Sequence, residues 1–263
     1  MERRAFVKCL GATTIYIGAS SCGAINIFGA RYNEEVCKSA WENLRELKSQ
    51  AFKYVTPQKK LPNVLIYGDS ISIGYTPIVR EMLSGKVNVF RIYTNGQSSD
   101  KFIPFMEKMK ETMFQPYLKG GWNFDWDLIH FNVGLHDLKY LADGKLDKET
   151  GKQMNNIEEY KTNLNKICMY LKKEFPNTKL IFATTTAVPD EGDAGRFGGD
   201  SIKYNNAAKA VLANYPSIVI NDLYGFTKPN SSKWYIKPRN VHYNNLGKTT
   251  QGKHVAKVIT ENL

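Results

Sequence analysis

The sequence predicts an α/β fold of three layers, α/β/α, built on a parallel sheet of about five strands. Short apolar runs alternate along the chain with longer segments in which apolar residues recur at helical spacing. This alternation favours parallel strands with helices on both faces of the sheet. The length of 263 residues, with 42% hydrophobic and 23% charged residues, suits one sizeable globular domain.

The first predicted element, which precedes the main domain, is an amphipathic helix, because Val36, Ala40 and Leu44 share one helical face. Pro57 marks its end, and the continuous apolar run at residues 64–67 is typical of a central parallel strand. The predicted helices are residues 33–54, 75–83, 101–117, 157–175, 201–214 and 246 to the C-terminus. The predicted strands are residues 64–67, 87–93, 128–133, 179–184 and 218–222, with a polar loop through Gly144 and Gly151.

The N-terminus is predicted to be an export signal. Residues 2–8 resemble a twin-arginine signal, and the modestly apolar run at 9–18 is too short for a permanent membrane span. Residues 19–23 resemble a bacterial lipoprotein box, which would make Cys22 a lipidated membrane tether; simple cleavage is the alternative. The expected location is therefore the periplasm, with or without this anchor. Residues 1–22 form the signal, 23–61 an N-terminal helical extension, and 62–263 the main domain.

The remaining cysteines of the mature chain are Cys37 and Cys168. An exported protein could join them in a disulfide, but their separation in sequence equally allows two unpaired helix cysteines.

The net charge of +11 is spread along the whole chain. A nucleic-acid-binding protein concentrates its basic residues on one stripe, so this pattern does not favour nucleic acid as a partner. Attraction to an acidic polysaccharide stays open.

The strongest chemical motif is Gly68-Asp69-Ser70, directly after the first predicted strand. A serine at a strand-to-helix turn is exposed at the sheet edge, where its hydroxyl can act as a nucleophile. The helix that follows favours developing negative charge at its N-terminus. The alternative is that Asp69 or Ser70 merely caps this helix.

A serine nucleophile needs a base, usually imidazole, and the chain has four histidines. His130 lies within a predicted strand and His254 within the last helix, which suits packing or scaffold roles. His136 and His242 both lie in loops at the expected active edge. Of the two, His242 stands in a more accessible loop and is the better candidate base.

The order of motifs resembles that of SGNH (GDSL-like) hydrolases, whose fold is flavodoxin-like. The matching blocks are residues 68–70, Gly96, residues 134–137 and His242, and the resemblance covers residues 62–263. It implies that Ser70 is the nucleophile and that the N–H groups of Ser70 and Gly96 form an oxyanion hole. Members of this superfamily hydrolyse acyl esters, often acetyl groups on carbohydrates, without metal or organic cofactor.

Two positions depart from the family pattern. His136 stands where an asparagine usually donates to the oxyanion, a role that imidazole can also fill. Arg239 stands where an aspartate usually orients the base, so Asn240, a backbone carbonyl or a distant carboxylate must orient His242. Asp69, Asp137 and Asn240 are expected to support the site.

The sequence therefore predicts an exported serine esterase that uses Ser70 and His242, acts on a small acylated substrate or an acetylated polysaccharide, and needs no cofactor. A catalytically weak or inactive glycan-binding protein on the same fold is the alternative, favoured by Arg239. A flavodoxin-like ligand binder has less support, because no phosphate-binding glycine loop follows the first strand.

A metal site at His130, His136 and Asp137 is disfavoured, because the first of these lies inside a strand and the others beyond its end. The sequence sets no oligomeric state. Tyr75, Trp122 and Trp126 are candidate sugar-stacking aromatics, with core packing as the more common role for such residues.

Overall fold

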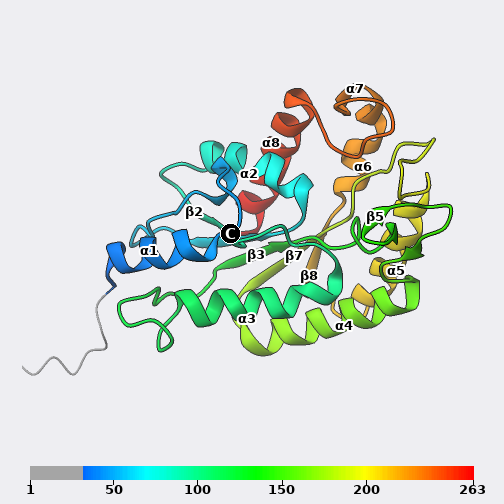
Figure 1. Ribbon diagram of the computed structural model, residues 1–263. Coiled ribbons are helices and arrows are strands. Elements are labelled where there is room, and N and C mark those ends of the chain that lie inside the picture. Colours follow the sequence, from blue (N-terminus) through cyan, green and yellow to red (C-terminus); the bar gives the residue numbers. More distant parts are fainter. Residues whose placement is uncertain (1–31) are drawn as a thin grey trace, which may run out of the picture. The chain divides into compact units, whose positions relative to one another are not determined.

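Five parallel strands form the central sheet, in the order β2-β1-β3-β7-β8 (Figure 1). The computed structural model describes residues 32–263, and the predicted parallel sheet is confirmed there. The strands are β1 (Asn63–Tyr67), β2 (Asn88–Arg91), β3 (Leu128–Phe131), β7 (Lys179–Ala183) and β8 (Ile218–Asn221).

Helices cover both faces of this sheet, which gives the predicted three layers (Figure 1). On one face, α2 (Ser70–Met82) packs against α8 (Asn245–Asn262). The other face carries α3 (Phe102–Met113), α4 (Ile157–Glu174) and α5 (Asp200–Leu212), with α4 in contact with both of the others. Strands β1, β2 and β3 are almost entirely buried between the layers, as their continuous apolar runs predict.

The first described helix, α1 (Glu34–Leu44), is shorter than the predicted helix at 33–54. The chain turns extended at Arg45 and forms a 3₁₀ helix, η1 (Gln50–Phe52). Trp41 Nε1 donates to the carbonyl of Phe52 at 2.7 Å, so tertiary packing of Phe52 overrides the helical pattern. Residues 32–263 form one compact unit that includes this segment.

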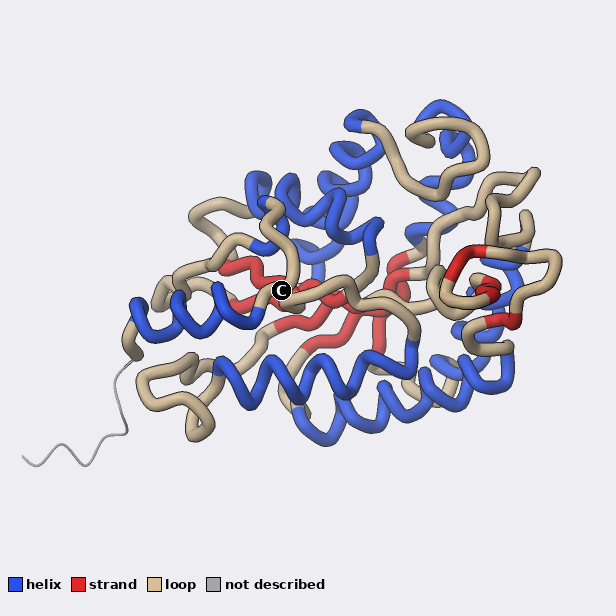
Figure 2. Tube along the Cα trace, viewed as in Figure 1, coloured by secondary structure: helices blue, strands red, loops and turns tan. Residues whose placement is uncertain are grey.

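A small antiparallel sheet replaces the polar loop that we expected after β3. It consists of β4 (Tyr140–Ala142), β5 (Lys145–Leu146) and β6 (Lys152–Gln153), drawn as short red segments in Figure 2. Two short helices, α6 (Leu223–Thr227) and α7 (Ser231–Trp234), with a 3₁₀ turn between them at Lys228–Asn230, precede the His242 loop and were also not predicted. These elements are too short to produce a readable hydrophobic period.

Cys37 and Cys168 are both buried and unpaired, in α1 and α4. The predicted export signal, with Cys9 and Cys22, lies outside the described residues. Within residues 32–263, no helix has the length and apolar character needed to cross a membrane.

The three candidate sugar-stacking aromatics are core residues, because Tyr75, Trp122 and Trp126 are all buried. Both tryptophans pack edge-on against Phe90 and Phe114 at the end of the sheet where β3 begins.

Candidate active site

Ser70 is the first residue of α2 and lies directly beyond the carboxyl end of β1. Asp69 caps this helix, since its Oδ1 accepts the N–H of Ile71 at 2.9 Å. The capping role that we kept as an alternative therefore belongs to Asp69 and leaves the hydroxyl of Ser70 free. The N–H of Ser70 lies in the first turn, where the helix offers no acceptor and its dipole favours negative charge.

A buried arginine fixes the turn that carries Ser70. Arg91 Nη2 donates to the carbonyls of Gly68 and Asp69, at 2.8 and 3.2 Å, and to the hydroxyl of Ser72 at 2.8 Å. Its guanidinium also lies over the ring of Phe52, 4.6 Å from the centroid. Burial lowers the pKa of Arg91 to about 9, yet the group stays charged at neutral pH. The charged guanidinium of Arg91 therefore stabilises the turn by donating hydrogen bonds to the backbone carbonyls of the turn.

His242 reaches Ser70 although 172 residues separate them: Nε2 and Oγ are 2.9 Å apart. Close packing of α2 on α8 brings the two residues together. Its closeness is seen at Gly252 of α8, where a Cβ would lie only 2.6 Å from the Cβ of Ile78 on α2. The loop before α8 is held by the bond from Asn244 N to the carbonyl of Trp234, at 2.7 Å. The structure therefore brings the two predicted residues within hydrogen-bond distance.

Asn240 orients the imidazole. Its Oδ1 accepts the backbone N–H of His242 at 2.8 Å and lies 3.0 Å from Nδ1 of the same residue. Because the backbone group can only donate, the atom facing His242 must be the amide oxygen, and Nδ1 must carry a hydrogen. Nε2 of the neutral ring then has a free lone pair for the Ser70 hydroxyl. This is the tautomer that a general base requires.

Arg239, at the position of the usual aspartate, is exposed and adopts a left-handed backbone conformation with φ of 55°. A neutral amide from the next residue, Asn240, thus replaces the carboxylate acceptor.

The environment keeps His242 neutral. Although His242 is exposed, desolvation by the protein atoms around its ring lowers its pKa below the usual value of 6.5; Arg196 and Lys248 lower it further, and Asp69 and Asp193 oppose them. Asp69 is the largest of these charge effects. The imidazole is therefore mostly unprotonated at pH 7 and free to accept a proton.

Gly96 does not fill its predicted place in the oxyanion hole. Its N–H already donates to the carbonyl of Gly68 at 3.0 Å, a bond that joins the loop after β2 to the turn after β1. A Cβ at this position would lie 2.7 Å from the Gly68 oxygen and 2.8 Å from the ring of Tyr67. Gly96 is therefore required for close packing behind the nucleophile turn, which corrects the sequence expectation.

His136 lies half-buried in the loop after β3, at the same edge of the sheet. Its Nδ1 is 3.2 Å from Nζ of Lys139. A protonated His242 would lower the pKa of His136, so the two rings lie close enough for their charges to interact. The loop begins at Gly134, where φ of 140° suits only glycine.

Asp137 fastens this loop to the one after β2. The carboxylate accepts the N–H and the hydroxyl of Ser99, at 2.9 and 2.5 Å, and Nδ2 of Asn155 at 2.7 Å. Burial nevertheless raises the pKa of Asp137 to about 6. Its support is therefore structural, since its bonds run to the loops and not to Ser70 or His242.

Two charged residues that we did not predict lie beside the site. Arg196 and Asp193 form a buried ion pair at 2.8 Å, and Arg196 Nε donates to the carbonyl of Leu135 at 3.0 Å. Both residues lie in the glycine-rich segment after β7. Their charges, in a loop at the carboxyl end of a strand, are the sequence feature that could have identified them as site residues. Lys139, which lies beside His136, was also not predicted, and no sequence feature distinguishes it from other lysines.

The other two histidines form a separate network. Asn221 Nδ2 lies 3.1 Å from His130 Nε2, and its Oδ1 lies 2.9 Å from His254 Nε2. His254 also stacks on Phe226, with centroids 3.9 Å apart. The packing role predicted for His130 is confirmed, and across residues 32–263 no group of three metal-binding side chains occurs.

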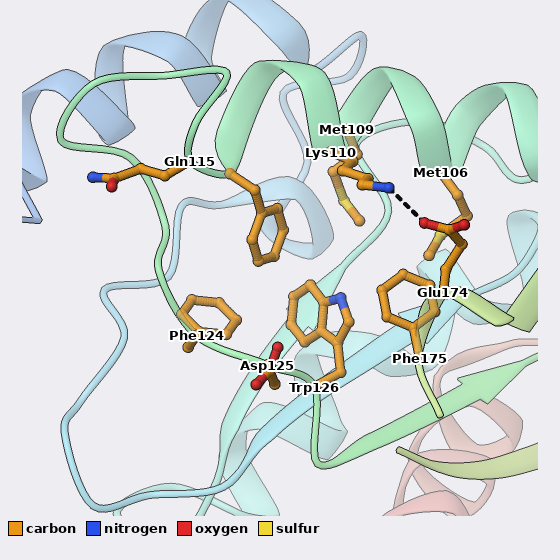
Figure 3. A pocket seen from close by; sticks show the side chains of 10 residues that line it. Met106, Met109, Lys110, Gln115, Phe124, Asp125, Trp126, Glu174 and Phe175 are labelled. Carbon is orange, nitrogen blue, oxygen red and sulfur yellow. Dashed lines mark hydrogen bonds and ion pairs between the residues drawn. The ribbon is translucent and has the colours of Figure 1, made fainter. Parts of the chain in front are cut away.

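Two cavities mark the opposite ends of the sheet. One of about 20 Å³ adjoins Ser70 and His242 and is otherwise lined by Ile71, Gly74, Tyr243, Lys248 and Gln251. A larger one, of about 170 Å³, lies where β3 begins, between aromatic side chains and the Lys110–Glu174 ion pair (Figure 3). Only the smaller cavity has a nucleophile and a base on its wall.

Fold and site together place the chain in the class of α/β proteins with the SGNH-hydrolase fold. Solved structures of that fold are similar to it over most of its length. An acetyl xylan esterase, AlAXEase, is 17% identical, with a TM-score of 0.55 over 75% of this chain and 99% of that one. A lipase/acylhydrolase from Enterococcus faecalis is 14% identical, with a TM-score of 0.58 over 77% and 97%.

A member of the lipolytic G-D-S-L family from Veillonella parvula DSM 2008 is 18% identical, with a TM-score of 0.53 over 75% of this chain and 98% of that one. No protein-family model matches the sequence, and neither does any curated protein. At these identities, the likeness describes the fold.

Proposed function

We propose that the protein is a serine esterase that removes an acetyl or other small acyl group from a carbohydrate. The observation that carries the proposal is the 2.9 Å contact between Ser70 Oγ and Nε2 of His242, whose tautomer Asn240 fixes. The similarity to an acetyl xylan esterase and to lipases of the same fold supports it.

In the proposed reaction, Ser70 Oγ attacks the ester carbonyl while its proton passes to Nε2 of His242. The resulting oxyanion is bound by the N–H of Ser70 and by Nε2–H of His136. Collapse of this intermediate breaks the bond to the alcohol, which leaves with the proton held on His242. Water then attacks the acyl-Ser70 ester by the same route and releases the carboxylic acid.

The cavity beside the nucleophile supports a small acyl group. About 20 Å³ is room for little more than one water-sized or methyl-sized group. The exposed position of His242 leaves the leaving-group side open to solvent. A bulky alcohol such as a glycan can therefore lie outside while the methyl end of its acetyl group enters.

The test is release of p-nitrophenol from its acetate, followed by release of acetate from acetylated xylan. Ser70→Ala and His242→Ala are each expected to lower kcat by about 10⁴ or more. Ser217→Ala, an exposed serine before β8, is the matched control and keeps full activity. Unchanged turnover in Ser70→Ala would sink the proposal.

The alternative is a glycan-binding protein of low or no activity. It is favoured by one observation: the acceptor for Nδ1 of His242 is a neutral amide, not a carboxylate. Wild-type turnover that disappears in Ser70→Ala would exclude this alternative, whereas binding of acetylated xylan without acetate release would support it.

We further propose export to the periplasm, with Cys22 as the lipid-bearing residue if the lipoprotein box is used. Expression of the full chain with Cys22→Ala, followed by membrane fractionation, tests this. Equal recovery of wild type and variant in the membrane fraction would contradict anchoring through this cysteine.

A further inference from the structure

His136 differs from an asparagine in one chemical respect that matters for an oxyanion. An amide always presents N–H donors, whereas a neutral imidazole has one donor and one acceptor nitrogen. His136 can therefore replace asparagine only if its hydrogen lies on the nitrogen that faces the substrate. A neighbouring group must therefore fix which ring nitrogen of His136 carries the hydrogen.

Lys139 is placed to make this selection. Its Nζ lies 3.2 Å from Nδ1 of His136, and an ammonium group can only donate. Nδ1 must therefore accept, and the hydrogen of the neutral ring lies on Nε2. Burial and Arg196 lower the pKa of Lys139, and Asp137 opposes them; the tautomer assignment holds for the ammonium form of this lysine.

The ring itself stays neutral. Burial lowers the pKa of His136 to about 3, and the positive charges of Lys139 and Arg196 act in the same direction, as would a proton on His242. The positive charge at this point of the site is consequently carried by Lys139 and not by the imidazole.

The loop holds the pair in place from both sides. The carbonyl of Lys139 accepts the N–H of Met154 at 2.9 Å, and the N–H of Leu138 donates to the carbonyl of Gly134 at 3.0 Å. On the other side, Arg196 donates to the carbonyl of Leu135. These hydrogen bonds fix the backbone of the loop and therefore the positions from which Lys139 and His136 contact each other.

We propose that Lys139 is a positioning residue that holds the neutral ring of His136 with its hydrogen on Nε2 and polarises this N–H toward the oxyanion. A cation bonded to Nδ1 makes the opposite N–H a stronger donor, as in other charge-assisted chains. Lys139 does not touch the substrate; it acts through His136. The inference rests on the esterase function proposed above.

The kinetic test combines two sites. Lys139→Met is expected to lower kcat about tenfold with little change in KM, less than the roughly 10²–10³ cost of losing a donor outright. Lys139→Arg, which keeps a cationic N–H donor, is expected to restore most of the rate. In a His136→Asn background, Lys139→Met should have no further effect, because the amide donates without help. Lys145→Met, an exposed lysine on β5, controls for the lost charge.

The tautomer is measured directly by ¹⁵N NMR of histidine-labelled protein, with the His136 signals assigned from His136→Asn. In the wild type, Nδ1 is expected to be unprotonated and Nε2 protonated, and Lys139→Met should weaken this preference. A wild-type ring protonated on Nδ1, or equal kcat losses from Lys139→Met in both backgrounds, would overturn the inference. The NMR result stands apart from turnover, so failure of the esterase proposal would show separately, as activity that survives Ser70→Ala.

Discussion

Replacing Asn240 by aspartate is the change that best isolates how the base is oriented. The two side chains have the same shape, so the acceptor for Nδ1 and for the backbone N–H of His242 is kept. Only a negative charge is added. Two unit charges 4 Å apart interact by about 1 kcal/mol in water and by about 4 kcal/mol at an effective dielectric constant of 20.

His242 is exposed, so the lower part of that range applies, about 1–2 kcal/mol. The charge stabilises the imidazolium that forms when Ser70 gives up its proton. We therefore expect Asn240→Asp to raise kcat/KM by about 5- to 30-fold. The same energy raises the pKa of His242 by about one unit, so the acid limb of the profile moves to higher pH and the gain shrinks in acid.

The assay is kcat/KM for p-nitrophenyl acetate between pH 5 and 9. Asn240→Ala should lower kcat/KM by at least about tenfold, up to the 10⁴ known for loss of the correct tautomer. Asn214→Asp, an exposed residue before β8, controls for net charge. If Asn240→Asp leaves both the rate and the acid limb unchanged, the amide oxygen does not face Nδ1 in the working protein.

Three further outcomes follow from the site. Gly96→Ala is expected to destabilise the fold by about 1–3 kcal/mol, because its Cβ would meet the backbone of Gly68 at 2.7 Å; thermal unfolding measures this. Arg91→Met is expected to cost at least about 3 kcal/mol in urea unfolding, since several buried carbonyls lose their donor, and an unchanged midpoint would refute its role. Because the pKa of His242 is lowered, the midpoint of the acid limb of kcat/KM should lie below the ordinary imidazole value of 6.5; a midpoint above that value would contradict the neutral base.

The strands and the two central site residues could be predicted because their signals are local. The apolar run of β1 and the motif after it fix where Ser70 lies, and parallel strands bring their carboxyl ends to one edge. The start of α2 was predicted five residues late, at Tyr75. Ser72 and Gly74 are weak helix formers, and the cap by Asp69 outweighs them.

The site features that could not be predicted depend on tertiary contacts that residue spacing in the sequence does not indicate. The N–H of Gly96 is occupied by a hydrogen bond to the carbonyl of Gly68, a contact between two loops that only the three-dimensional structure reveals. Lys139 is an ordinary lysine in sequence, and its role follows from a ring nitrogen 3.2 Å away. Asn240 stood among three alternatives until the backbone bond to its oxygen was seen.

The charges around the site favour an oxyanion over an imidazolium. Lys139 and Arg196 lower the pKa of His136, and at His242 the main lowering cause is desolvation, which the negative charge of Asp69 opposes and the positive charges of Arg196 and Lys248 reinforce. A proton on His242 is therefore less stable than in water, which makes it a weaker base. The same cations stabilise negative charge on the substrate oxygen. Because the proton moves to His242 as that charge forms, the two effects oppose each other in one step, and the missing carboxylate beside Nδ1 is where the balance can most readily be shifted.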